Sequence, residues 1–292
     1  MLFDTYEGYI SPMYQNASSF VTTPIALLTD FGLSDSYVGV MKGVIAGLAP
    51  GVVCIDISHE IQPQDIAGAA WVLASSYRYF PPRTIFVCVV DPGVGSQREP
   101  VALHAGEWFF VGPNNGLFSY ILQEQTVHEA VVLANSAYHL SHVSMTFQGR
   151  DIFAPVAAFL ARAVPLADLG PAIQASALQQ LNIALPFMQD EAISAQVVHV
   201  DRFGNLITNI PVLLVADLFS YSVVRLSFSH TGVVVNARRR FFAETTGRPE
   251  DDQLPFLYVD SSGYIGAALQ NGSAASVLGI AGGEPCSLLL VL

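Results

Sequence analysis

The chain has 292 residues, of which 52% are hydrophobic and 12% are charged, so it can bury a large core and is not expected to be disordered. Its 12 Lys and Arg residues against 24 Asp and Glu residues give a formal net charge of −12, which repels polyphosphates and excludes nucleic acid as an expected partner. No stretch has the run of about 18 uncharged apolar residues that a membrane helix needs, so no membrane partner is expected. The cysteines Cys54, Cys88 and Cys286 are far apart and show no CxxC spacing, which predicts neither a disulfide framework nor a zinc site and fits the reducing cytoplasm.

The first half of the chain predicts alternating strands and helices. Residues 1–23 contain no Lys or Arg and no continuous apolar stretch, so we interpret them as an N-terminal extension and not as a secretory signal. Short apolar runs predict strands, and apolar residues at helical spacing predict the helices between them. The predicted strands are 24–31, 52–57 and 84–90, and the predicted helices are 35–49, 63–79 and 151–163. This order implies right-handed crossovers, so residues 24–170 are expected to form an α/β domain with a mainly parallel sheet.

The second half of the chain predicts a different architecture. The irregular segment 171–192 is expected to be a linker, because it contains prolines and no sustained periodicity. Beyond it, short runs rich in β-branched residues are separated by turn residues, a pattern typical of antiparallel strands. These strands are predicted at 195–200, 223–228, 232–236, 257–259, 263–269 and 287–292. Residues 193–292 are therefore expected to form a smaller antiparallel β-barrel domain, and the fold class of the whole chain is α/β.

Two acids fall at the ends of predicted parallel strands. Asp30 and Asp91 each end an apolar run, and each is followed by a glycine turn. Ligands of open parallel sheets bind beyond the carboxyl ends of the strands, where a carboxylate can accept two hydrogen bonds from a ribose diol. The alternative interpretation is that these acids only cap a helix or order a turn.

The segment 91–98, with the sequence DPGVGSQR, is the sharpest local motif. It places the carboxylate of Asp91 and the guanidinium of Arg98 on one glycine-rich loop. One interpretation is a charge pair that holds and polarises a small nucleophile. The other is a surface ion pair of Arg98 with Glu99 or Glu107.

Two further clusters carry polar groups next to predicted strands. In the segment 201–209, Phe203 could stack on a base and the Asn205 amide could read an adenine edge, although a tight hairpin loop explains the same composition. Asp56 and His59 could form a catalytic pair, but a buried hydrogen-bonded turn is favoured. The other histidines have no partner at metal-ligand spacing, so no metal is expected.

Six motifs in a fixed order resemble one known family. They read TDFGLSD, DISHEI, VDPGVGSQR, PNNGL, TFQGRDIFAP and DRFGNLITNI, and they are similar to those of the S-adenosylmethionine hydroxide adenosyltransferases, relatives of the fluorinating and chlorinating enzymes. The resemblance runs from about residue 25 to the C-terminus. It implies an N-terminal α/β domain, a C-terminal β-barrel domain and a homotrimer whose sites lie between subunits. It also implies three ligands, namely S-adenosylmethionine, adenosine and methionine, and no cofactor.

The resemblance also implies roles for individual residues. Asp30 is expected to hold the ribose hydroxyls, Asp201 the methionine amino group and Asn205 the adenine. Ser261 and the backbone near Leu269 are expected to line the methionine and adenine ends of the site. Asp91 and Arg98 match two members of an Asp-Arg-His set around the attacking water.

The third member of that set is replaced. The family usually reads TFHGRD, whereas this chain has Gln148 at the histidine position. Glutamine can orient water but cannot titrate, and a positioned general base contributes roughly 10²- to 10⁴-fold to a rate. The expected activity is therefore hydrolysis of S-adenosylmethionine to adenosine and L-methionine by attack at the ribose C5′, slowed by Gln148.

Two alternatives to hydrolysis stay open from the sequence. The first is a non-catalytic protein that binds S-adenosylmethionine or adenosine, which Gln148 favours. The second is a halide-dependent adenosyl transferase. The resemblance speaks against it, because the fluorinating relatives have a tyrosine and a tryptophan where this chain has Asp91 and Gln64, and a long insertion where it has the short link 105–107.

Overall fold

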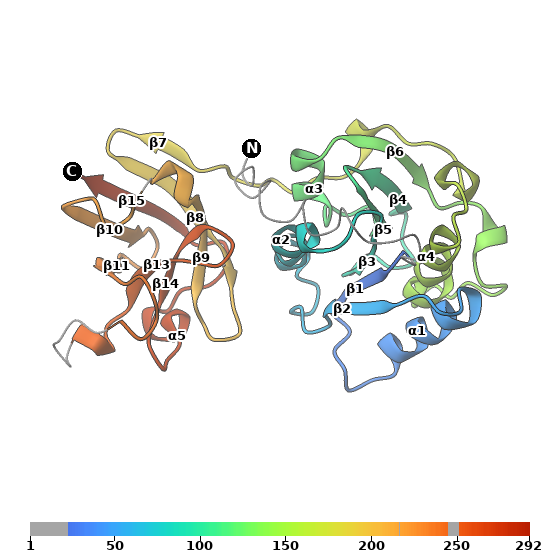
Figure 1. The fold of residues 1–292 in the computed structure, drawn as a ribbon, viewed down its shortest axis with the longest axis horizontal. Coiled ribbons are helices and arrows are strands. Elements are labelled where there is room, and N and C mark those ends of the chain that lie inside the picture. The colour runs from blue at the N-terminus through green and yellow to red at the C-terminus, as the bar shows by residue number, and fades with distance from the viewer. Residues whose placement is uncertain (1–22, 216, 245–250) are drawn as a thin grey trace, which may run out of the picture. The chain divides into compact units, whose positions relative to one another are not determined.

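The computed structural model describes residues 23–215, 217–244 and 251–292, which form two compact units that divide between Leu181 and Asn182. Figure 1 shows the helices and strands of each unit. The expected N-terminal extension lies outside the described residues except for Thr23, and the boundaries expected at 24, 171 and 193 stay predictions.

The first unit is built on a sheet with the strand order β2-β1-β3-β5-β4-β6. The strands are β1 (Ile25–Thr29), β2 (Cys54–Ser58), β3 (Ile85–Val89), β4 (Pro100–Ala105), β5 (Trp108–Pro113) and β6 (Val127–Val132). Strands β2, β1, β3 and β5 are parallel, and β4 and β6 add an antiparallel edge. This arrangement confirms the expected α/β fold class with a mainly parallel sheet.

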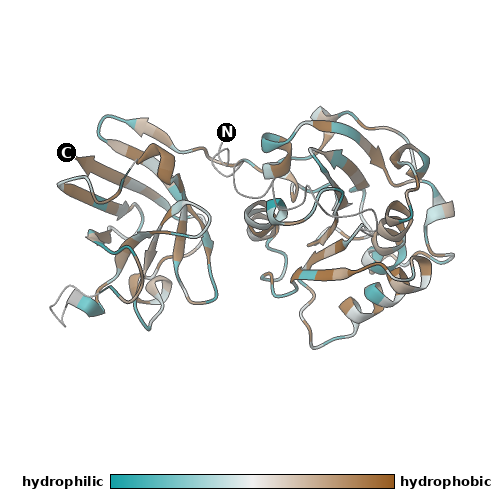
Figure 2. Cartoon of the chain, in the orientation of Figure 1, coloured by the Kyte–Doolittle hydropathy of each residue, from teal (hydrophilic) through white to brown (hydrophobic). Residues whose placement is uncertain are grey.

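Helices cover both faces of this sheet, as Figures 1 and 2 show. Successive strand residues point to opposite faces, so Leu27 packs with α1 and α4 while Leu28 packs with α2 and α3. The helices are α1 (Tyr37–Leu48), α2 (Ile66–Ser76), α3 (Ser119–Glu124) and α4 (Ala154–Ala161). Because both faces are covered, β1 and β3 are buried along their whole length, and all their residues are apolar except Thr29 at the end of β1.

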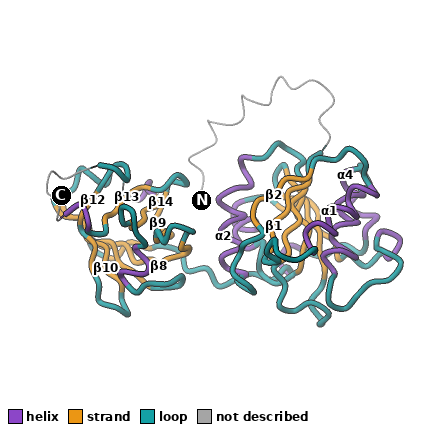
Figure 3. The backbone as a smooth tube through the Cα atoms, turned by 90° about the horizontal axis from the view of Figure 1, so that it is seen from below, coloured by secondary structure: helices purple, strands orange, loops and turns teal. Residues whose placement is uncertain are grey.

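The second unit is a barrel-like sheet with the strand order β11-β10-β15-β8-β9-β14-β13-β12, in which β7 also pairs with β8 (Figure 3). Alternate residues of β15, including Cys286, Leu288 and Leu290, point into its core. The strands are β7 (Phe187–Gln189), β8 (Ala192–Val200), β9 (Leu206–Pro211), β10 (Val223–Phe228), β11 (Val234–Val235), β12 (Ala237–Arg238), β13 (Phe256–Val259), β14 (Tyr264–Ala268) and β15 (Pro285–Val291). The helix α5 (Ala274–Leu278) follows β14. The pairing is antiparallel except between β12 and β13.

The structure corrects several expected elements. The helix predicted at 63–79 begins only at Ile66, because the Asp65 side chain accepts the Gly68 N–H at 2.9 Å and caps the first turn. The helix predicted at 151–163 opens with a π-helical turn, Gly149–Phe153. The hairpin loop expected over 201–209 is shorter, since β9 begins at Leu206.

The chain is anchored on each side of the division between the units. In the first unit, Asn114 Oδ1 accepts the Gln179 N–H and Ser119 Oγ accepts the Leu181 N–H, both at 2.7 Å. In the second unit, Asn209 Nδ2 donates to the Ala184 carbonyl at 2.6 Å. The turn motif PNNG therefore holds the end of the first unit in place through the hydrogen bond that Asn114 accepts. No helix within the described ranges combines the length and the apolar character needed to cross a membrane.

Candidate functional site

Asp30 and Asp91 lie at one edge of the first unit's sheet. β1 and β3 are neighbouring parallel strands in which Thr29 pairs with Val89, so the residues that follow them emerge together. Asp30 Oδ2 accepts the Gln64 backbone N–H at 2.8 Å, which fixes one oxygen of that carboxylate. The position matches the expected ligand edge of an open parallel sheet.

Asp91, Arg98 and Gln148 form one hydrogen-bonded group. Arg98 donates to both oxygens of Asp91, from Nε to Oδ1 at 3.0 Å and from Nη2 to Oδ2, and Nη2 also donates to Gln148 Oε1. The Asp91 and Arg98 side chains are only 5% and 10% exposed. Arg98 therefore pairs with Asp91, and the alternative pairing with Glu99 or Glu107 is wrong.

Glycines give the loop 91–98 its shape. Gly95 has φ +77°, and a Cβ at this position would lie 2.4 Å from the Met145 carbonyl oxygen. Only a residue without a side chain fits such an approach at this backbone angle. The contact brings the loop against the segment that precedes Gln148. Gln148 itself precedes the π-helical turn, and such turns are frequent at functional sites.

Arg98 keeps one donor for a ligand. Its Nη1 is buried and has no hydrogen-bond partner among the described residues. Buried donors are nearly always satisfied, so an unpaired guanidinium nitrogen beside a fixed carboxylate indicates a place for a polar ligand or water. The Arg98 guanidinium also lies over the Phe153 ring, 5.6 Å from its centroid.

Asp201 organises the loop between β8 and β9 in the second unit. Its Oδ1 accepts the N–H groups of Phe203 at 2.9 Å and Asn205 at 2.8 Å, and its Oδ2 accepts the Asn205 side-chain amide at 2.7 Å. Since a carboxylate only accepts, this contact fixes which end of the Asn205 amide faces Asp201. The Phe203 ring is 77% exposed and presents a free apolar face.

A second acidic turn lies beside this loop. Asp260 accepts the N–H groups of Ser262 at 3.0 Å and Tyr264 at 2.7 Å, and it holds Ser261 exposed at the tip of the β13–β14 hairpin. Burial raises the pKa of Asp260, backbone N–H donors oppose the rise, and the neighbouring charge of Asp201 adds to it. Burial and the carboxylates of Asp260 and Asp201 likewise raise the pKa of Tyr258. Leu269, half-buried, follows β14 and bridges to Gly272.

The predicted residues thus form two groups, one in each unit. Asp91, Arg98 and Gln148 are in contact, and Asp30 emerges at the same sheet edge. In the second unit Asp201 contacts Asn205 and is an electrostatic neighbour of Asp260. Sequence reasoning missed Tyr258 and Asp260, for which the only available signal was the turn sequence DSSG after a strand.

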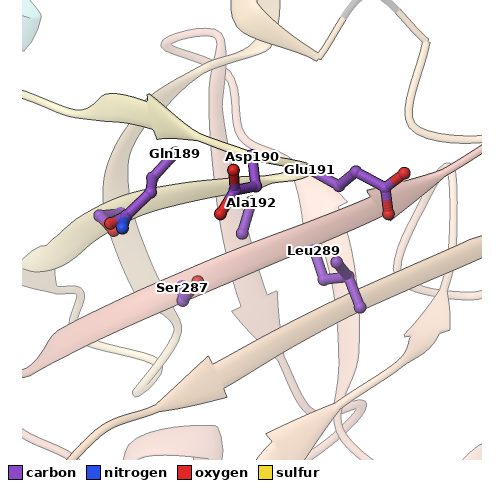
Figure 4. Close-up of a pocket in the computed structure, with 7 residues that line it drawn as sticks. Gln189, Asp190, Glu191, Ala192, Ser287 and Leu289 are labelled. Atoms are coloured by element: carbon purple, nitrogen blue, oxygen red, sulfur yellow. The ribbon is translucent and has the colours of Figure 1, made fainter.

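One open cavity of the second unit holds none of the predicted residues. Asp190 and Glu191 lie at the turn between β7 and β8, beside Ser287 and Leu289 of β15 (Figure 4). Within the described ranges, no three His, Cys, Asp or Glu side chains gather as a metal site would require.

Comparison with known proteins gives consistent matches over most of the chain. Residues 25–170 match the SAM hydroxide adenosyltransferase N-terminal domain, and residues 195–287 match the C-terminal domain of the same family. The (R)-S-adenosyl-L-methionine hydrolase of Salinispora arenicola is 38% identical over an alignment of 271 residues that covers 90% of this chain and 97% of that protein. The hydrolase of the same name from Thermus thermophilus is 36% identical over 91% of this chain and 99% of that protein.

More distant and structural matches agree with these. A fluorinase of an Actinoplanes species is 28% identical over 64% of this chain and 71% of that protein. The crystal structure of a conserved protein from Thermotoga maritima superposes with a TM-score of 0.81 at 34% identity, over 91% of this chain and 99% of that chain.

Proposed function

The chain belongs to the SAM hydroxide adenosyltransferase family, and on that premise we propose how its residues hydrolyse S-adenosylmethionine to adenosine and L-methionine. Water or hydroxide attacks the ribose C5′, a C–O bond forms, and the C5′–S bond breaks with its electron pair going to sulfur. The sulfonium leaves as a neutral thioether, and the proton of the attacking water is released. Because a neutral leaving group needs neither an acid nor a Lewis acid, the reaction requires no cofactor.

The Asp91–Arg98 pair, with Arg98 Nη1 unpaired beside it, is the single observation that carries the mechanism. Arg98 stabilises hydroxide character on the attacking oxygen, and Asp91 orients the water or accepts its proton. Gln148, bonded to Arg98, orients the guanidinium and the water without titrating. We therefore expect a slower reaction than with a histidine at this position.

The remaining predicted residues are proposed to bind the substrate. Asp30 offers its carboxylate to the ribose diol, and Asp201 offers an anionic surface to the methionine ammonium. Phe203, with its exposed ring, supplies a stacking face for the base, while the Asn205 amide reads the adenine edge. Ser261 and the backbone near Leu269 line the two ends of the ligand.

The proposal also covers the oligomeric state of the protein and its cellular compartment. The resemblance favours a homotrimer in which subunits share the sites. The free thiols Cys54, Cys88 and Cys286 favour the reducing cytoplasm. Burial raises the pKa of Cys286 to about 12, which keeps this thiol unreactive.

The alternative of a binding protein without turnover rests on Gln148 alone. The halide alternative is weaker, because the buried carboxylate of Asp91 next to the proposed nucleophile position repels an anion. Formation of a 5′-halogenated adenosine in the presence of halide would revive it.

The test is adenosine formation by the purified protein, followed by chromatography. Arg98→Ala is expected to lower kcat by roughly 10²- to 10³-fold, the usual loss for one donor to a developing charge. Arg225→Ala, on the exposed face of β10, is the matched control and is expected to leave kcat unchanged. Undiminished adenosine formation by Arg98→Ala would exclude the role of this residue. Activity that appears only in Gln148→His would establish the binding-protein alternative.

A further inference from the structure

His59 is a buried histidine that the proposed mechanism does not use. It follows β2, its exposure is 3%, and it contacts the turn that carries Asp30 at two points. Its ring Nδ1 lies 2.9 Å from Thr29 Oγ1, and its backbone carbonyl accepts the Gly32 N–H at 2.8 Å. Thr29 and Gly32 stand on either side of Asp30, so His59 holds both ends of this turn.

The contact with Thr29 is part of a row of polar side chains. Lys42 Nζ of α1 donates to Asp56 Oδ2 at 2.6 Å, and Asp56 Oδ1 lies 3.1 Å from His59 Nε2. The latter is an electrostatic contact without the alignment of a hydrogen bond, since Nε2 is otherwise unpaired among the described residues. Burial raises the pKa of Asp56, but the hydrogen bond from Lys42 and the close contact with His59 outweigh it, so the pKa is lowered overall.

The far end of the row sets the backbone next to Asp30. Thr29, which is 1% exposed, accepts the Phe31 N–H on the same Oγ1 at 3.2 Å. The same Oγ1 therefore joins the Phe31 N–H and the His59 ring, and either the Thr29 hydroxyl or the His59 Nδ1 donates in the second bond, according to the His59 tautomer. From the other side, Gln64 N–H binds Asp30 Oδ2, so Oδ1 is the oxygen left for a ligand.

We propose that His59 is a positioning residue for Asp30: through Thr29 and Gly32 it fixes the turn that presents the Asp30 carboxylate to the ribose diol. The inference rests on the proposed function in taking the ligand to be an adenine nucleoside whose ribose diol Asp30 binds. A buried histidine with a purely structural role would support the fold equally for every ligand. If His59 positions Asp30, its loss weakens the binding only of ligands that carry the ribose hydroxyls.

The experiment measures binding, so that it does not depend on turnover. Calorimetric titration compares adenosine with 2′,3′-dideoxyadenosine, which lacks both hydroxyls. The wild-type chain is expected to bind adenosine about tenfold more tightly, the size of one or two net hydrogen bonds. His59→Ala is expected to bring this ratio near one by weakening adenosine binding only.

Two further variants keep the test informative if His59→Ala folds poorly. Thr29→Val removes the hydroxyl while keeping the shape, and is expected to lower the same ratio. His59→Asn keeps a hydrogen-bonding group near the Nδ1 position. It is expected to restore part of the affinity ratio that His59→Ala loses. His128→Gln, an exposed histidine on β6, is the control and is expected to leave the ratio unchanged.

The outcomes separate this inference from the hydrolase proposal. Equal loss of affinity for both nucleosides in His59→Ala, or an unaltered ratio in Thr29→Val, overturns the positioning role. If the wild-type chain discriminates between the two nucleosides and His59→Ala does not, the positioning role stands. If the wild-type chain also forms no adenosine from S-adenosylmethionine, the hydrolase proposal is removed and the positioning role stays in place.

Discussion

Asp260 shows how one partly buried acid links the stability of the second unit to pH. Its carboxylate is needed as an acceptor for the Ser262 and Tyr264 N–H groups, yet burial and Asp201 raise its pKa. A raised folded pKa means that its favourable contribution is complete below the unfolded value, near 3.8, and is lost as the pH rises through the folded value.

Asp260→Asn is therefore expected to raise the thermal unfolding midpoint at pH 7, because asparagine keeps the acceptor and removes the charge. The gain should shrink as the pH falls toward about 4. Asp217→Asn is the matched control, since the Asp217 carboxylate accepts the Phe219 N–H in an exposed turn. A midpoint that gains as much at pH 4 as at pH 7 would contradict this account.

At the residue scale, the sequence predicted groups that act within one loop better than groups that meet across loops. Asp91 and Arg98 were predictable as a pair because one glycine-rich turn carries both. Arg98 and Gln148 are fifty residues apart, and their two segments also approach each other where Gly95 meets Met145, an arrangement that no local pattern reveals.

The loop 91–98 is the element on which the proposed nucleophile site depends. Gly95→Ala would place a Cβ 2.4 Å from the Met145 carbonyl oxygen at φ +77°. We expect a loss of at least about 1 kcal/mol in the free energy of unfolding, from backbone strain and the clash together. Adenosine formation should fall as well, because the contact orients the segment before Gln148.

Gly43→Ala provides the matched control for Gly95→Ala. Gly43 lies within α1 with open space around its Cβ position, so alanine should stabilise the chain by roughly 0.5–1 kcal/mol. Chemical denaturation measures both changes. A Gly95→Ala chain as stable as the wild type would show that the loop can move away from Met145 without cost.

Elements with clear periodicity were predictable, and those decided by tertiary contacts were not. β1 and β3 are buried runs that are apolar except for Thr29, and their prediction is confirmed to within two residues at each end. β6 was missed because only Ala130 and Val131 are buried in it and the exposed His128 and Glu129 interrupt its apolar run. The π-helical turn before α4 has no sequence signature, and its first residue, Gly149, lies close to Met41, whose Sδ would be 3.2 Å from a Cβ at that position.

The acidity of the whole molecule has a kinetic consequence. A net charge of −12 attracts S-adenosylmethionine, which carries one net positive charge at neutral pH. Raising the ionic strength from about 0.02 M to about 0.2 M is expected to lower kcat/KM by less than about tenfold and to leave kcat unchanged. Adenosine, which is neutral, is the control ligand, and its affinity should not respond to salt. A kcat/KM that rises with salt would refute the attraction.

At this scale the sequence predicted two architectures because the periodicity changes along the chain. The first unit has its apolar residues in two clusters on either face of one sheet, and the second has a separate cluster inside its barrel-like sheet. The exact place of the division was not predictable. Leu178, in the irregular segment, packs into the first unit's core, and Asn114 and Ser119 hold its neighbours.

The hydrogen bond from Asn205 to Asp201 also bears on base selection. Because the amide nitrogen is held against a carboxylate, the Asn205 oxygen cannot exchange places with it without setting two acceptors face to face. In the proposed role this oxygen meets the amino group at position 6 of adenine. Hypoxanthine carries an oxygen there, so a ligand deaminated at that position would be rejected, and the loop would distinguish adenosine from inosine before any chemistry at C5′ takes place.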